Sequence, residues 1–164
     1  MPQNLRELLE LRAAAAPDKT FLISEADGRD FTYRQFDAAV DRAARLLGAA
    51  GVTKGDRVSL LLPNSAEYVI AYFACFKLGA LAGPVNSLLK PEEVAYVVGD
   101  SGAKLLLVNT EFLPRVEGLR GQVGSLESVL VFDDWDAATA AHREGAGDRW
   151  RDTHLTRDDE AIII

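Results

Sequence analysis

The stretch from Lys54 to Val108 most constrains the fold of this chain, because three short apolar runs alternate in it with two helix-like segments. The apolar runs are RVSLLL at 57–62, LAGPV at 81–85 and KLLLV at 104–108. Runs this short, without apolar–polar alternation, are typical of strands buried on both faces of a parallel sheet. Strands separated by single helices require right-handed crossover connections. The sequence therefore predicts an α/β fold, with a mainly parallel sheet and helices on both of its faces.

The two segments between these runs carry helix-boundary signals. The first helix is predicted over about 65–78, with Asn64 and Glu67 in a capping-box pattern and Gly79 just past its end. It contains only two charged residues, so we expect it to be covered on most sides. The second is predicted over about 91–101, since it opens on a proline followed by two glutamates.

The segments on either side of the central stretch predict further elements. Before it, we expect a helix capped by Asn4 and Glu7 and ending near Ala16, a β-hairpin of 20–24 and 29–33, and a helix capped by Thr32 and Gln35 and ended by Gly51. After it, we expect a short helix from about Glu111, a strand at 128–132, a helix capped by Asp134 or Asp136, and a surface loop at 145–157.

The last seven residues, DDEAIII, are typical of a polar approach to a buried strand. An apolar strand exposed at the end of a domain would invite association through its edge and its side chains. We therefore expect residues 1–164 to be one incomplete subdomain of a longer protein. In the isolated piece, Ile162–Ile164 would form an unpaired strand stub. That stub and the apolar helix at 65–78 predict a homo-oligomer.

Composition narrows the class of protein. The chain has 164 residues, of which 48% are hydrophobic and 26% are charged, as in an ordinary globular domain. Its net charge of −7 argues against non-specific nucleic-acid binding. A single cysteine, Cys75, excludes an internal disulfide and is typical of a reducing compartment. The apolar stretch 68–85 is interrupted by two glycines, a proline and a lysine, so no membrane span is predicted.

No nucleophile–base pair, metal cluster or phosphate loop can be assembled from the sequence, so no catalytic, cofactor-binding or metal-binding residue is predicted. The side chains that could carry chemistry suit structural roles instead: solvated histidines, a buried thiol, helix caps and a solvated approach to the last strand. They are His142, His154, Cys75, Asp133, Asp134, Asp136, Asp158, Asp159 and Glu160. The first strand is followed by LPNS, which lacks the glycines of a dinucleotide turn, and GDSG at 99–102 lacks the required spacing.

A family resemblance supplies what the residues alone do not. It covers nearly the whole chain, and most strongly residues 31–108. The chain resembles the N-terminal portion of the adenylate-forming enzymes, which include acyl-CoA synthetases, peptide-synthetase adenylation domains and luciferases. The matching positions are Thr32, Tyr33, Gly55, Asp56, Arg57, Val58, Asn64, Glu67, Lys77, Gly79, Ala80, Pro84, Asn86, Glu93, Tyr96 and Ser101.

This resemblance implies a ligase that acts in two steps. A carboxylate attacks ATP to give an acyl-adenylate and pyrophosphate, and a thiol, usually that of coenzyme A, then takes the acyl group. It implies ATP, Mg²⁺ and coenzyme A for the full-length, cytoplasmic enzyme, and none of them for residues 1–164. DDEAIII resembles the strand that leads into the family's Ser/Thr/Gly-rich ATP-phosphate loop, which would begin just past Ile164. The present chain would then be an inactive scaffold.

The segment VNSLLKPEEVAYVV resembles acyl-CoA synthetases for fatty and aromatic acids more than peptide-synthetase domains. Leu88 departs from this pattern, because many relatives have an arginine there. Pro84 and Asn86 belong to a family motif, in which a structural turn is at least as well supported as a substrate contact. Two alternatives stay open: an adenylation domain that loads a carrier protein, and a non-catalytic, flavodoxin-like binding domain.

Overall fold

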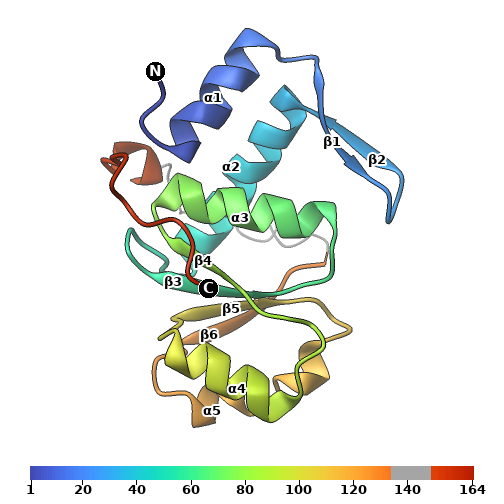
Figure 1. Cartoon of the computed structure of the whole chain (residues 1–164), viewed down its shortest axis with the longest axis vertical. Coiled ribbons are helices and arrows are strands. Elements are labelled where there is room, and N and C mark those ends of the chain that lie inside the picture. Colours follow the sequence, from blue (N-terminus) through green and yellow to red (C-terminus); the bar gives the residue numbers. More distant parts are fainter. Residues whose placement is uncertain (134–148) are drawn as a thin grey trace.

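A four-stranded parallel sheet divides the molecule into two helical layers (Figure 1). The computed structural model describes residues 1–133 and 149–164. The strands lie in the order β4 (Leu81–Pro84), β3 (Arg57–Leu61), β5 (Leu105–Val108) and β6 (Ser128–Val131), all parallel. The parallel arrangement of the three central runs, and the further strand near 128–132, are thus confirmed.

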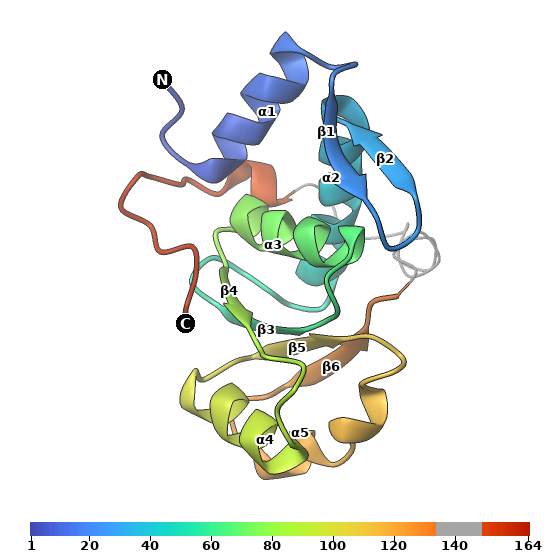
Figure 2. The ribbon, with the colours of Figure 1, turned by 45° about the vertical axis from the view of Figure 1, so that its right-hand side comes forward.

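The upper layer contains α1 (Leu5–Ala15), α2 (Tyr33–Ala49), α3 (Ala66–Leu78) and a β-hairpin (Figure 1). Helix α3 lies next to the sheet, and α1 and α2 pack against it (Figure 2). The antiparallel hairpin of β1 (Thr20–Ser24) and β2 (Arg29–Thr32) covers one end of this layer. Every residue of α3 is buried or half-buried, so the expectation that this apolar helix would be covered is confirmed. Helix α3 therefore exposes less apolar surface in this chain than the sequence predicted.

The helix caps of the upper layer agree with the sequence in two cases and differ in one. Asn4 caps α1 and Thr32 caps α2, each through its side-chain oxygen. The Asn64 cap predicted for α3 is wrong, because the Ser65 hydroxyl accepts from the Tyr68 backbone N–H at 3.2 Å. The helix therefore begins one residue later, and Glu67 is not in a capping box. Its carboxylate instead accepts a hydrogen bond from Arg29 Nη2 at 2.5 Å.

The lower layer is thinner. It contains α4 (Pro91–Asp100), the 3₁₀ turn η1 (Leu113–Arg115) and the single-turn helix α5 (Leu119–Gln122). The backbone N–H of Lys90 donates to Glu93 Oε2 at 2.7 Å at the start of α4. The prediction of one helix from about Glu111 is wrong in detail, since Gly118 is left-handed at φ +78° and separates η1 from α5.

The two faces of the sheet have separate cores. Along β5, Leu105 and Leu107 pack into the upper core, whereas Leu106 and Val108 pack into the lower one. All four side chains are fully buried. A strand that is apolar at every position is therefore explained by helices on both faces.

The segment after the second core differs most from expectation. The helix predicted to be capped by Asp134 or Asp136, together with His142, lies outside the described residues, as does the first part of the predicted surface loop at 145–157. In its described part, the loop prediction agrees with the exposure of Arg151, Asp152, His154 and Arg157, but it is wrong for two residues. Trp150, in the 3₁₀ turn η2 (Arg149–Asp152), and Leu155 are only 4% and 6% exposed. Trp150 lies against the ammonium of Lys77, and Leu155 packs against Gly79.

The last residues return to the sheet beside β4. Ile162 forms a parallel bridge with Ala82, supported by hydrogen bonds from Ala82 N to Ala161 O at 2.9 Å and from Ile163 N to Ala82 O at 3.1 Å. The expectation of an unpaired stub is therefore wrong, because β4 offers a free edge on the side away from β3. Ile162 stays 47% exposed and Ile164 is fully exposed.

Candidate functional site

Ligands of open parallel α/β sheets bind outside the carboxyl ends of the strands, at the point where the strand order reverses. Here the order reverses between β3 and β5, since the chain runs from β3 to β4 on one side and then to β5 on the other. The loops after these strands and after β4 therefore form the first candidate site.

After β4, the side chain of Asn86 stabilises the turn in which it lies. Its Oδ1 accepts a hydrogen bond from the Leu88 backbone N–H at 2.9 Å, two residues along the chain. Arg115, from η1, donates to the carbonyl of Ser87 and closes this turn onto the lower layer. The Leu88 side chain is exposed. These contacts are those of the structural turn that the sequence analysis left open for Pro84 and Asn86.

In the loops after β3 and β5, polar side chains likewise bind backbone N–H groups. Ser65 caps α3 after β3, and Asn109 Oδ1 accepts from the Phe112 backbone N–H at 2.9 Å after β5. Both carboxylate oxygens of Asp133 accept from the Thr110 backbone N–H, at 2.9 and 3.0 Å. Asp133 thus stabilises the loop that follows the neighbouring strand β5. The polar side chains that cap these loops are therefore already used in holding the loops themselves.

The terminal strand points to this same edge. Because residues 161–163 run parallel to β4, the chain moves toward the carboxyl end of the sheet as it reaches Ile164. The close approach leaves little room beside Gly83, where an added Cβ would lie 3.2 Å from Ile163 Cγ2.

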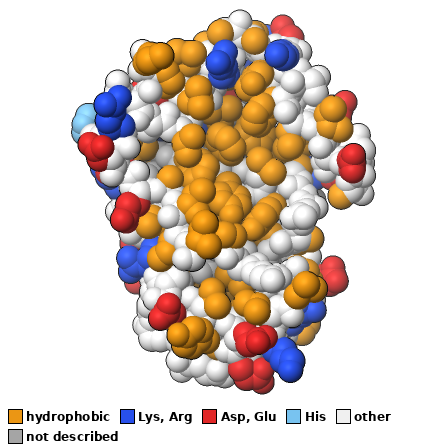
Figure 3. All heavy atoms as spheres, viewed as in Figure 1, with side chains coloured by type: hydrophobic (Ala, Val, Ile, Leu, Met, Phe, Trp, Pro, Cys, Tyr) orange, Lys and Arg blue, Asp and Glu red, His pale blue; other side chains and the backbone are white. Residues whose placement is uncertain are grey.

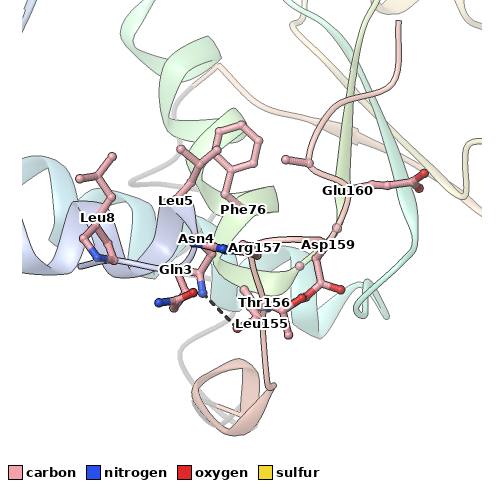
Figure 4. Close-up of a pocket in the computed structure, with 14 residues that line it drawn as sticks. Gln3, Asn4, Leu5, Leu8, Phe76, Leu155, Thr156, Arg157, Asp159 and Glu160 are labelled. Atoms are coloured by element: carbon pink, nitrogen blue, oxygen red, sulfur yellow. Dashed lines mark hydrogen bonds between the residues drawn. The ribbon is translucent and has the colours of Figure 1, made fainter.

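A second candidate is a half-open cavity of about 360 Å³ between the start of α1, the end of α3 and the chain after Trp150 (Figure 4). Leu5, Leu8, Phe76 and Leu155 give it an apolar lining. Asn4 Nδ2 donates to the Leu155 carbonyl at 3.2 Å along one wall, as the dashed line in Figure 4 marks. Its volume lies at the small end of the range for ligand pockets.

Of the two acidic side chains that line this cavity, Asp159 is already paired, whereas Glu160 is exposed. Asp159 forms an ion pair with Lys54 at 2.7 Å and accepts from the Thr156 backbone N–H at 2.6 Å. The hydrogen bond from Lys54 holds the pKa of the Asp159 carboxyl below its ordinary value. The prediction of a solvated acidic approach to the last strand is therefore wrong for Asp159, whereas Asp158 and Glu160 are exposed.

A buried ion network joins α2, the end of α3 and η2. Lys77 is 1% exposed, and its Nζ donates to Asp37 Oδ1 at 2.6 Å and to Asp41 Oδ1. Asp41 also pairs with Arg151 at 2.8 Å, and Nζ of Lys77 lies 5.1 Å from the centre of the Trp150 ring. Buried charges paired in this way are structural. Sequence reasoning noted Lys77 but missed its partners, which are 36 and 40 residues away.

The other predicted residues keep the structural roles expected of them. Cys75 is fully buried in α3, and burial raises the pKa of its thiol to about 12, so it behaves as a small apolar side chain. His154 is exposed. Within residues 1–133 and 149–164, no three His, Cys, Asp or Glu side chains lie close enough to hold a metal ion. No helix in these same ranges is long and apolar enough to cross a membrane.

Comparison with known proteins extends this picture. The family model of the AMP-binding enzymes matches residues 9–164. The long-chain-fatty-acid–CoA ligase FadD13 of Mycobacterium tuberculosis is 32% identical over 146 residues, which are 89% of this chain and 29% of the relative. The 3-hydroxybenzoate–CoA/4-hydroxybenzoate–CoA ligase of Thauera aromatica is 40% identical over 112 residues, 68% of this chain and 21% of the relative.

The fold agrees with these relatives. The inhibitor-bound crystal structure of the N-terminal domain of FACL13 from M. tuberculosis superposes with a TM-score of 0.86 at 27% identity, over 98% of this chain and 40% of that one. The chain spans less than a third of the length of the curated relatives it matches. With its α/β architecture and a family match over nearly its whole length, this chain belongs to the family of AMP-binding enzymes.

Proposed function

We propose that this chain is the N-terminal part of an ATP-dependent carboxylic acid–CoA ligase, with residues 1–164 as a scaffold subdomain and the ATP-phosphate loop following Ile164. The observation that carries the proposal is the parallel pairing of residues 161–163 with β4. A loop that followed Ile164 would leave the sheet at its carboxyl edge, where α/β proteins bind nucleotides. The names of the relatives support coenzyme A as the acceptor and a fatty or aromatic acid as the substrate.

The described residues do not fit the cofactors of this reaction by themselves. The polar side chains at the carboxyl edge bind backbone groups of the loops there, and no acidic cluster in residues 1–133 and 149–164 could hold Mg²⁺. Phosphoryl and adenylyl transfer require oriented cations and backbone donors around the phosphates. We therefore assign ATP, Mg²⁺ and coenzyme A to a longer, cytoplasmic polypeptide and derive no catalytic step for the residues described here.

Two measurements test this proposal. A polypeptide that continues past Ile164 with a Ser/Thr/Gly-rich loop should form acyl-CoA from ATP, coenzyme A and at least one acid of a panel of fatty and aromatic acids. Failure across the whole panel would contradict it, and transfer to a carrier protein instead would favour an adenylation domain. The 164-residue chain alone should bind ATP no better than at about millimolar Kd in calorimetry. A micromolar Kd would show a nucleotide site that we have not assigned.

We also propose that the isolated 164-residue chain self-associates. Hydrophobic side chains gather over the middle of the face shown in Figure 3, and the outer edge of residues 161–164 has no partner within the described residues. Ile162 and Ile164 lie exposed on this edge. Light scattering at micromolar concentration should show a dimer or larger species, and Ile162→Lys should shift it toward monomer. A monomer with the native sequence would exclude this proposal.

A further inference from the structure

Residues 149–160, here called the strap, precede the terminal strand and contact the start of the N-terminal helix α1. The strap lies against the start of α1 and the end of α3, and then delivers residues 161–163 to β4 (Figures 1 and 4). Only two backbone hydrogen bonds join the terminal strand to β4 within the described residues. So few bonds fix a register weakly, and the contacts of the strap therefore become important.

Arg6 makes the contact that joins the strap to the helical layer. Its Nη1 donates to the carbonyls of Trp150 at 2.8 Å and of Lys77 at 3.3 Å, and its Nη2 donates to the carbonyl of Thr153 at 2.7 Å. Arg6 is half-buried on α1. One side chain thus holds three backbone carbonyls from two segments that lie more than 70 residues apart in sequence.

The three carbonyls have different settings. Lys77 is in the last turn of α3, and Thr153 follows η2. The Trp150 carbonyl lies within η2 and also accepts a hydrogen bond from the Thr153 backbone N–H at 3.1 Å. The last carbonyls of a helix have no partner within the helix, and a cation beside them interacts favourably with the negative end of its dipole. A guanidinium presents five N–H donors in a rigid fork, so Arg6 can bind the end of α3 and two carbonyls of the strap at once.

Other contacts of the strap use side chains. Arg151 pairs with Asp41 at 2.8 Å, and the Trp150 ring lies against the Lys77 ammonium. Further contacts lie closer to its C-terminal end. Asn4 Nδ2 donates to the Leu155 carbonyl, and Lys54 donates to the His154 carbonyl at 2.9 Å and pairs with Asp159. Lys54 and Asp159 are 39% and 27% exposed, and a pair this accessible to solvent contributes little. Arg6 is the charged contact that fixes the strap to the end of α3 through backbone atoms, which do not change rotamer.

We propose that Arg6 is a positioning residue, which sets the register of residues 161–163 on β4 by fixing the strap on α3. This inference rests on the proposed function, because the register decides where a loop following Ile164 would meet the carboxyl edge. A slip of one residue would move that point by about 3.3 Å and turn the strand's side chains to the opposite face. Arg6 would then act on the ligase reaction without touching a substrate.

Hydrogen exchange of single amides in the 164-residue chain tests the inference. Arg6→Ala should accelerate exchange of the Ala82 and Ile163 amides about tenfold or more, because these two donate the bonds of the terminal strand. The Val85 and Lys104 amides donate to the carbonyls of Leu60 and Arg57 in β3. Their exchange rates should not change. Arg12→Ala removes the same charge from an exposed position of α1 and should leave all four amides unchanged.

Arg6→Lys separates geometry from charge and guards against a variant that does not fold. Lysine keeps the charge but cannot reproduce the fork, so Ile163 exchange should stay several-fold faster than in the native chain. Equal Ile163 rates in the native chain and in both Arg6 variants would overturn the inference. Uniform acceleration of all four amides would overturn it as well, because Arg6 would then support general stability only.

A longer polypeptide with ligase activity offers a second readout. There, Arg6→Lys should lower kcat several-fold while the KM for the acid stays unchanged, because the acid site itself would be intact. An unchanged kcat would contradict a positioning role. The exchange experiment uses no nucleotide and no acid. It can therefore fail while the ligase proposal stands, and it can succeed when the acid panel gives no product.

Discussion

The two helical layers of this protein cover the same sheet in different ways. Above the sheet, α3 is apolar around its circumference, and α1, α2 and the β1–β2 hairpin pack over it (Figure 1). Below the sheet, α4 buries one side through Val94 and Val98, while Tyr96 is 71% exposed. The difference shows that the width of a helix's apolar face sets how many layers must follow. A helix that is apolar all round requires a second cover, whereas an amphipathic one does not.

The largest expected effect compares neighbouring leucines of β5. Leu107 faces the upper core and Leu106 the lower one, and both are fully buried. We expect Leu107→Ala to lower the free energy of unfolding by about 4 kcal/mol and Leu106→Ala by about 3 kcal/mol, since the thicker upper layer can collapse less around a cavity. Urea denaturation of both variants measures this. A larger loss for Leu106→Ala would break the comparison between the layers.

Lys77 sharpens the comparison, because a buried cation occurs in the upper core. Lys77→Met leaves Asp37 and Asp41 without this partner, so we expect a loss of about 3 kcal/mol in the free energy of unfolding. Adding Asp37→Asn and Asp41→Asn should recover part of the loss. In the lower layer, the exposed Glu92 of α4 serves as the control, and Glu92→Ala should change stability by less than about 0.5 kcal/mol. A neutral Lys77→Met would mean that the network contributes nothing to folding.

Two glycines with left-handed backbone, one in each layer, test how closely neighbouring side chains pack there. Gly79 has φ +72°, and a Cβ there would lie 2.5 Å from Leu155 Cδ2. Gly118 has φ +78°, but its nearest neighbour would be a flexible side-chain atom of Gln122 at 3.8 Å. We expect Gly118→Ala to cost about 1 kcal/mol for the backbone alone, and Gly79→Ala about 2 kcal/mol because the strap must also shift. Thermal unfolding of the two variants provides the measurement, and equal costs would show that the strap yields freely.

The smallest effect concerns the amino edge, which both layers share. Lys104 donates to Asp56 at 2.9 Å and to the Gly51 carbonyl. Burial alone would raise the pKa of Asp56, but hydrogen bonds from Lys104 and Thr53 outweigh it and lower the pKa below its ordinary 3.8. Because the pKa is lower in the folded chain, the stabilisation is present above about pH 4 and is lost as the pH falls through the folded value.

Asp56→Asn should therefore reduce stability at pH 7 by less than about 1 kcal/mol and flatten the decline in stability on the acid side of pH 4. Denaturation midpoints between pH 3 and pH 7 measure the effect. An acid decline as steep as that of the native chain would assign the pH dependence to other carboxylates.

The sequence by itself determined the elements and their packing class. Short apolar runs predicted the strands, Asn4 and Thr32 predicted two helix starts, and the uncharged face of α3 predicted its burial. These features depend on residues close together in the chain, so local patterns reveal them. The family resemblance also came from the sequence, because it rests on residue types and spacings.

Only the tertiary structure decided the features that join distant segments. It placed Lys77 between Asp37 and Asp41, buried Trp150 in a segment expected to be a loop, and paired Ile162 with Ala82. It also showed that Asn86, Asn109 and Asp133 cap loops at the carboxyl edge. Each depends on which surfaces meet after folding, and hydrophobic periodicity carries no information on that choice. Even the choice of Ser65 over Asn64 as a cap was decided by the path of the chain leaving β3, which gave Ser65 the extended backbone that a cap requires.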